Sequence, residues 1–304
     1  MEIKEFTEKL KNALDIKLGE EYQIQSVQVP KNNSVLLQGL SIQKLEQNVA
    51  PTIYINGFLD AYNDGVPLAS IVDRMLEIIQ KDSPTGEIDM SFFQRFEEVQ
   101  DRICFRIICA EKNKELLKRI PHKLFLDLAI CFFYAYQGDE LGNGSILIHN
   151  THVDMWRTST EALWKLAQKN TERIFPWENK SMECVIRELM LKKHDINEED
   201  LEEDLFDKTI PMYVFSNKER LYGASCVLYS EVLNQLAQEL DANLFILPSS
   251  IHEVILLPDA HQDSPEQLKN MIKEINETQV EPEDVLSDNL YYYDRKEGKI
   301  RLLL

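Results

Sequence analysis

Four polar residues near the start of a predicted strand carry the ingredients of acyl transfer. Ser249 and Ser250 supply hydroxyls, His252 supplies an imidazole and Glu253 a carboxylate. A hydroxyl nucleophile needs an adjacent base that a third group orients, and these residue types can fill those roles. Neighbouring strand residues point to opposite faces of a sheet, however, and no G-x-S-x-G turn presents either serine. We therefore interpret the serines as turn residues that bond backbone groups, and the charged pair as a tie between the strand and a neighbour.

A second group combines two imidazoles with a carboxylate. His149, His152 and Asp154 directly follow a short predicted strand at 145–148, a position where loops commonly hold functional sites. Imidazole and carboxylate are suitable ligands for zinc or manganese. The H-x-x-H spacing does not match H-E-x-x-H, and the sequence fixes no third ligand. These residues are thus candidate ligands of a divalent metal, with hydrogen-bonded loop residues as the favoured interpretation.

A third candidate is a single carboxylate in an apolar stretch. Asp127 interrupts residues 124–136, which we predict to form one strand beside a strand at 103–109. A buried carboxylate needs a partner or a raised pKa, and a raised pKa suits a general acid. Lys123 or Arg106 would be the partner in a structural ion pair, which we consider the more common outcome.

The elements that must position these groups centre on residues 211–259. Their pattern predicts strand, polar turn, short strand, helix, strand, turn and strand, and such a pattern is buried by a sheet with a covering helix. The run Leu244–Leu247 is continuously apolar and predicts a central strand covered on both faces. The site candidates therefore lie at the ends of later strands of one αβ unit.

The N-terminal part predicts a separate subdomain. Residues 2–18 place apolar side chains on one helix face, residues 22–42 predict a β-hairpin, and residues 48–80 predict two helices. The turn residues Ser83–Gly86 mark a boundary. We expect an α+β fold with a mixed β-sheet and covering helices, divided into an N-terminal subdomain (1–86) and a larger αβ subdomain (87–304), or one continuous fold.

Composition excludes several classes of protein. The chain has 304 residues, of which 44% are hydrophobic and 28% charged, as in globular proteins with a full core. Its net charge of −19, from 52 acidic and 33 basic residues, repels phosphate backbones and anionic lipid. We expect no nucleic-acid and no membrane partner. The acid-rich segment from Asp195 to Asp207 predicts a solvated loop or a helix with a thin apolar stripe, and it lacks the pattern of an EF-hand.

The expected compartment is the cytoplasm. The N-terminal residues lack the basic start and apolar centre of a signal peptide. The most apolar run, residues 124–136, is too short to cross a bilayer. The five cysteines form no C-x-x-C pair and fit reduced core residues better than disulfides.

Six motifs spread along the chain carry a family resemblance. They are NVAPTIYIN at 48, PHKLFLDLAICF at 121, HVDMWRTSTEALWKLAQKNTERIFP at 152, PMYVFSN at 211, YGASCVLY at 222 and LPSSIHEVILLP at 247. Together they resemble an uncharacterised bacterial family, catalogued as a domain of unknown function, over nearly the whole chain. Residues 121–258 show a looser similarity to a second uncharacterised bacterial family, which has Arg-Asp where this chain has His252–Glu253. That replacement implies a site that does not need imidazole chemistry. Neither resemblance implies catalytic residues.

Two hypotheses of function remain from the sequence. The leading one is a cytosolic, non-enzymatic α+β protein that binds another protein or a small molecule without a cofactor, because it has a full core and no catalytic pattern. The alternative is a metal-assisted hydrolase that uses His149, His152 and Asp154, with help from His252 or Glu253.

Overall fold

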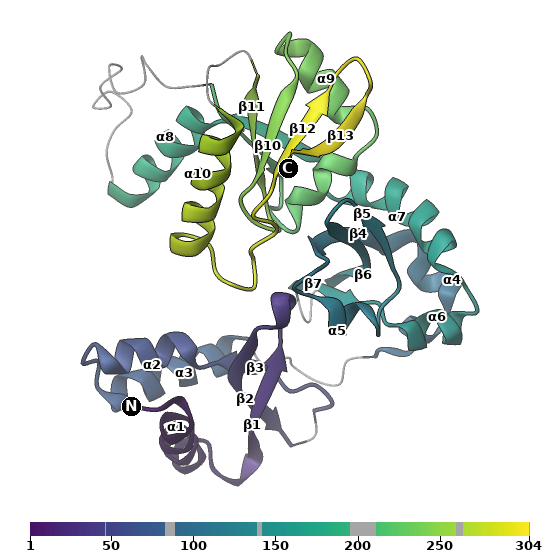
Figure 1. Ribbon diagram of the computed structural model, residues 1–304. Coiled ribbons are helices and arrows are strands. Elements are labelled where there is room, and N and C mark those ends of the chain that lie inside the picture. The colour runs from purple at the N-terminus through teal and green to yellow at the C-terminus, as the bar shows by residue number, and fades with distance from the viewer. Residues whose placement is uncertain (46, 83–88, 139–141, 195–210, 260–263, 304) are drawn as a thin grey trace. The chain divides into compact units, whose positions relative to one another are not determined.

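The computed structural model describes residues 1–45, 47–82, 89–138, 142–194, 211–259 and 264–303, shown in Figure 1. The chain divides into two compact units. Unit 1 comprises Met1–Arg95 with Ala135–Ser145, and unit 2 comprises Phe96–Tyr134 with Ile146–Leu304. The boundary predicted near residue 86 falls in the segment 83–88, which lies outside the described residues. The acid-rich segment 195–207, predicted to be a solvated loop or a helix, also lies outside them.

Unit 1 packs three helices on a small antiparallel sheet. The sheet order is β1-β2-β3, and β1 pairs with β2 over nine residues as the predicted hairpin. Phe6, Leu10 and Leu14 of the first helix are fully buried, as its apolar face predicts. They join a core formed with the two later helices and the sheet. The elements are α1 (Ile3–Leu18), β1 (Tyr22–Pro30), β2 (Leu36–Lys44), β3 (Thr52–Tyr54), α2 (Asn56–Asn63) and α3 (Leu68–Asp82).

The larger sheet of unit 2 has the order β13-β12-β10-β11-β9-β8. Its strand β10 is central and buried along its length, as the apolar run predicts. The helix α10 packs on this sheet through Leu268 and Ile272, and Figure 1 shows it lying along the strands. The elements are β8 (Trp177–Ser181), α8 (Met182–His194), β9 (Tyr213–Asn217), α9 (Val232–Glu239), β10 (Leu244–Pro248), β11 (Val254–Pro258), α10 (Pro265–Thr278), β12 (Leu290–Asp294) and β13 (Lys299–Leu303).

A second sheet, mainly of unit 2, has the order β4-β6-β5, and β7 also pairs with β6; the segment Ala135–Ser145, which takes in parts of β6 and β7, is assigned to unit 1. Side-chain hydroxyls accept hydrogen bonds from backbone N–H groups at the unpaired edge of β4. The N–H of Phe105 donates to Thr171 (3.0 Å), and that of Ile107 donates to Ser225 (3.2 Å). Both hydroxyls are buried, so they close an edge that would otherwise accept another strand. The elements are α4 (Phe96–Val99), β4 (Ile103–Cys109), α5 (Lys114–Leu117), β5 (His122–Phe125), β6 (Leu128–Gly138), β7 (Gly142–Leu147), α6 (Asn150–Trp156) and α7 (Thr160–Ile174).

The α+β class is confirmed, and several details differ from expectation. The strand pairs with a described register are antiparallel, where the sequence predicted a mixed sheet. Many of these strands are joined by short hairpin connections, which bring neighbouring strands back in opposite directions. The short strand expected near Leu221 is instead a left-handed residue, Tyr222, followed by the 3₁₀ helix Gly223–Leu228. Among the described residues, no helix is both long and apolar enough to span a membrane.

Candidate functional site

The imidazoles of His149 and His152 lie together at the start of α6. The backbone N–H of His149 donates to Nδ1 of His152 (3.1 Å), and the two rings meet edge to face with centroids 5.6 Å apart. Burial lowers the pKa of His152, and the neighbouring His149 lowers it further. The His152 ring also lies against Trp156, with centroids 5.7 Å apart. His152 thus caps a helix end in its neutral form.

The third predicted ligand of this group, Asp154, is exposed on the same helix. Among the residues that the structure describes, no group of three or more His, Cys, Asp or Glu side chains is arranged to hold a metal ion. The residues at 149–154 and those at 249–253 therefore do not combine into one ligand set within that part of the chain.

Ser250, from the predicted group of Ser249, Ser250, His252 and Glu253, bonds backbone atoms. Ser250 Oγ accepts from the backbone N–H of His252 (3.0 Å), and the Ser250 N–H donates to the carbonyl of Glu253 (3.1 Å). Ser216, in the neighbouring strand β9, donates its hydroxyl to the carbonyl of His252 (2.7 Å). Ser249 follows the end of β10 and is half-buried. These bonds form a turn between β10 and β11, as expected of serines in turns.

The imidazole of His252 contacts a different set of groups. Its Nδ1 lies 3.3 Å from the Tyr222 backbone nitrogen and 3.1 Å from the Arg220 carbonyl, so the tautomer decides which contact is a hydrogen bond. Its Nε2 lies 3.5 Å from Oδ1 of Asp284. The ring stacks on that of Tyr222, with centroids 5.8 Å apart and planes 14° apart. The imidazole is therefore oriented by a carboxylate and an aromatic ring that the sequence did not connect to it.

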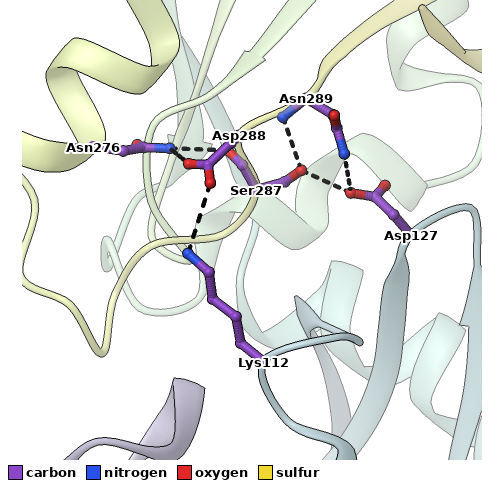
Figure 2. Close-up of polar contacts among 6 residues, drawn as sticks. All are labelled: Lys112, Asp127, Asn276, Ser287, Asp288 and Asn289. Atoms are coloured by element: carbon purple, nitrogen blue, oxygen red, sulfur yellow. Dashed lines mark hydrogen bonds and ion pairs between the residues drawn. The ribbon is translucent and has the colours of Figure 1, made fainter. Parts of the chain in front are cut away.

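The position predicted for Asp127 is corrected. The stretch 124–136 contains the end of β5, a two-residue turn and most of β6, and Asp127 lies in the turn after the left-handed residue Leu126. Its partners are neither Lys123 nor Arg106. One carboxylate oxygen accepts from Ser287 (2.7 Å) and Asn289 (3.0 Å), as Figure 2 shows, and the other accepts from the Tyr291 hydroxyl (2.7 Å).

The loop that holds Asp127 is itself fixed by α10. The Asn276 amide donates to the carbonyl of Ser287 (3.0 Å) and to the carboxylate of Asp288 (2.8 Å), and Lys112 lies 3.8 Å from the same carboxylate (Figure 2). Burial raises the pKa of Tyr291, and its hydrogen bond to Asp127 raises it further, so this hydroxyl remains a donor at neutral pH. The network joins the two sheets of unit 2 and has the character of a structural tie.

A cavity of unit 2 contains none of the predicted site residues. It has a volume of about 560 Å³ and lies between the segment 227–234 and the β12–β13 hairpin. We call it the hairpin cavity. It is lined by the apolar or aromatic residues Phe125, Val227, Leu228, Tyr229, Leu233, Tyr293 and Ile300, and by Glu231, Asn234, Arg295, Lys296, Glu297, Gly298 and Lys299.

The hairpin cavity has both apolar and charged lining residues, unlike a second hollow of about 500 Å³ in unit 1. That hollow is lined by polar residues or by residues with a hydroxyl: Lys4, Thr7, Glu8, Ser26, Gln28 and Gln38. Ligand sites are mostly apolar, with a few polar groups that fix orientation, and the hairpin cavity matches this description better. The sequence carried a weak signal for it, because Gly298 and its charged neighbours mark a hairpin turn.

The chain belongs to the Family of unknown function (DUF5688), whose sequence profile matches residues 3–295. The resemblance to a domain of unknown function is confirmed over nearly the whole chain. No curated protein and no solved structure matches this chain.

Proposed function

We propose that this chain is a cytosolic, non-enzymatic module that binds a small molecule in the hairpin cavity. The observation that carries the proposal is the cavity itself. Its volume of about 560 Å³ lies within the range of ligand sites, and it combines buried aromatic walls with a charged rim. Burial raises the pKa of the lining residue Tyr293, and Glu231 on the rim raises it further, so the phenol is a neutral donor for a ligand.

The absence of an enzyme activity is supported by how the predicted catalytic groups are used. Ser250 bonds the backbone of its own turn, and Asp127 accepts three hydrogen bonds from neighbouring donors. An activated nucleophile instead needs its hydroxyl within hydrogen-bond reach of a base.

A cytosolic location is supported by the cysteines. All five are free, and Cys104, Cys109, Cys131 and Cys226 are buried. Reduced core cysteines are typical of proteins from a reducing compartment. The net charge of −19 supports the companion proposal that nucleic acid and anionic membranes are not partners.

The binding proposal is tested with N-phenyl-1-naphthylamine, a neutral aromatic probe whose fluorescence rises in apolar surroundings. Asn234 lines the cavity. Its amide donates to the exposed carboxylate of Glu231 (3.1 Å), and its side-chain oxygen accepts from the exposed amide of Gln238 (3.3 Å). Asn234→Trp places an indole among the lining residues and reduces the volume open to a ligand. We expect saturable binding to the wild type and at least about tenfold weaker binding to Asn234→Trp.

Gln235→Trp is the matched control, because Gln235 is the next residue of α9, is exposed and does not line the cavity. It should bind the probe like the wild type. Equal binding to both variants, or no saturable binding to the wild type, would contradict the proposal.

The metal-assisted hydrolase that uses His149, His152 and Asp154 stays a prediction. It is tested by metal analysis of protein purified without chelator and without an affinity-tag metal. Stoichiometric zinc or manganese, together with a rise in melting temperature when either metal is added, would replace the binding proposal with the hydrolase.

A further inference from the structure

Arg106 is a charged residue in the middle of an otherwise buried strand. The strand β4 reads ICFRIIC, and its other six residues are buried while Arg106 is half-buried. Removing a guanidinium from water costs free energy unless an anion or hydrogen-bond acceptors replace the lost water.

No such replacement is present among the described residues. The Nε atom of Arg106 is buried and has no hydrogen-bond partner there. The residue paired with Arg106 across the strands is Cys131. Burial raises the pKa of the Cys131 thiol to about 12, so the thiol is neutral at neutral pH and supplies no negative charge. The Nε–H of Arg106 is therefore left unsatisfied, and no described carboxylate forms an ion pair with the guanidinium at this point of the sheet.

An aromatic platform holds the guanidinium in place. The Arg106 Cζ lies 4.6 Å from the centroid of the Tyr222 ring. That ring stacks on His252 and meets Phe133 edge to face, with centroids 5.2 Å apart. A cation over an aromatic face gains about 0.5 to 2 kcal/mol, but the ring does not neutralise the charge.

The backbone fixes this platform. Tyr222 is left-handed with φ of 54°, a conformation that costs a non-glycine residue free energy. The following residue, Gly223, has no room for a side chain, because a Cβ there would lie 2.5 Å from the carbonyl oxygen of His252. Tyr222 and the guanidinium that it supports are thus held in one arrangement.

We propose that Arg106 binds an oxyanion, the carboxylate or phosphate group of a ligand, and that Tyr222 orients the guanidinium for it. The planar guanidinium presents paired N–H donors that match two oxygens of either group. The half-exposure of Arg106 gives the anion a path to the side chain. The carboxylate of Asp284 lies 3.5 Å from Nε2 of His252. None of these residues lines the hairpin cavity, so the proposal stands independently of the proposed function.

The test follows thermal unfolding in sodium phosphate and, separately, in sodium acetate, each compared with sodium chloride at equal ionic strength. Arg301→Met is the matched control for Arg106→Met. The Arg301 Cζ also lies over an aromatic ring, 4.8 Å from the Tyr292 centroid, but Asp294 lies 4.0 Å from its guanidinium. We expect one of the two anions to raise the melting temperature of the wild type and of Arg301→Met.

The same anion should have at least about tenfold weaker apparent affinity for Arg106→Met. Arg106→Lys should give an intermediate affinity, because lysine keeps the positive charge but lacks the paired N–H donors of the guanidinium. The anion that acts distinguishes a phosphate ligand from a carboxylate ligand. An equal rise in every variant, or no rise in the wild type with either anion, overturns the proposal.

A second measurement keeps the test valid if Arg106→Met does not fold. The Nε–H resonance of Arg106 in the wild type is followed by NMR as phosphate or acetate is added. A saturable shift supports the site, and an unchanged resonance in both titrations overturns it.

Discussion

Asp127 lies in the turn between β5 and β6, and Arg106 lies in β4 of the same sheet, but only one of the two charged side chains has its hydrogen-bonding groups satisfied. The Asp127 carboxylate accepts hydrogen bonds from Ser287, Asn289 and Tyr291. The Arg106 guanidinium stacks on Tyr222 and leaves a buried Nε without a partner among the described residues. A satisfied charge contributes to the fold, whereas an uncompensated one costs stability and needs another explanation.

The comparison assigns different roles to the two residues. The partners of Asp127 lie on the loop before β12 and on β12 itself, so the carboxylate joins the two sheets of unit 2. Arg106 has its closest described contacts with an aromatic platform that is itself held by a strained turn. If the comparison is right, removing Asp127 should lower the free energy of unfolding, and removing Arg106 should change ligand binding more than stability.

The largest effect is expected from Asp127→Ala. The substitution leaves the hydroxyls of Ser287 and Tyr291, which are 3% and 4% exposed, without their acceptor. Each unsatisfied buried donor costs about 1 to 3 kcal/mol, so we expect a loss of about 3 to 4 kcal/mol in the free energy of unfolding. Urea denaturation measures it. Asp127→Asn keeps one acceptor oxygen and should lose less; equal losses would show that the hydrogen bonds are not the cause.

A somewhat smaller loss is expected from Gly223→Ala, which removes the support of the Arg106 platform. The new Cβ would lie 2.5 Å from the His252 carbonyl oxygen and 2.8 Å from the Asn217 nitrogen, both backbone atoms that cannot rotate away. Overpacking of this kind costs about 3 kcal/mol at its upper end. Gly57→Ala is the control, because a Cβ at Gly57 has nothing within 4 Å. Similar denaturation midpoints for both variants would show that Tyr222 is not locked as described.

A near-neutral effect on stability is expected from Arg106→Met. The methionine keeps an apolar stem against Tyr222 and removes an uncompensated charge, and such replacements are often neutral or stabilising. We expect a change of less than about 1 kcal/mol in the free energy of unfolding, measured by urea denaturation without added phosphate or acetate. A loss as large as that of Asp127→Ala would mean that Arg106 is as structural as Asp127, and it would remove the contrast.

The smallest effect concerns His152, whose hydrogen bond depends on its protonation state. Its Nδ1 accepts from the His149 N–H, which only an unprotonated nitrogen can do, and burial lowers its pKa below the ordinary 6.5. The unfolded chain therefore binds the proton first. Stability from this residue is complete above the ordinary pKa and is lost as the pH falls through the lowered value. Melting temperatures from about pH 8 to about pH 5 should fall less for His152→Gln than for the wild type.

Local patterns in the sequence determined much of the fold. The strand at 103–109, the N-terminal hairpin, the helix at 2–18 and the central strand at 244–247 were predictable because burial of one face or of both faces leaves a regular apolar spacing. Ser250 bonds the backbone of its own turn, as its residue type predicts, since short hydroxyl side chains readily bond nearby backbone groups.

Only the tertiary structure decided which polar groups are partners. Asp127 lies 160 or more residues from its three hydrogen-bond donors, and Arg106 lies more than a hundred residues before the ring that supports it. The turn at Leu126 and the left-handed Tyr222 were also hidden, because neither residue type favours a positive φ by itself. Periodicity records which face of an element is buried, but hydrogen bonds and ion pairs depend on which distant segments that face meets.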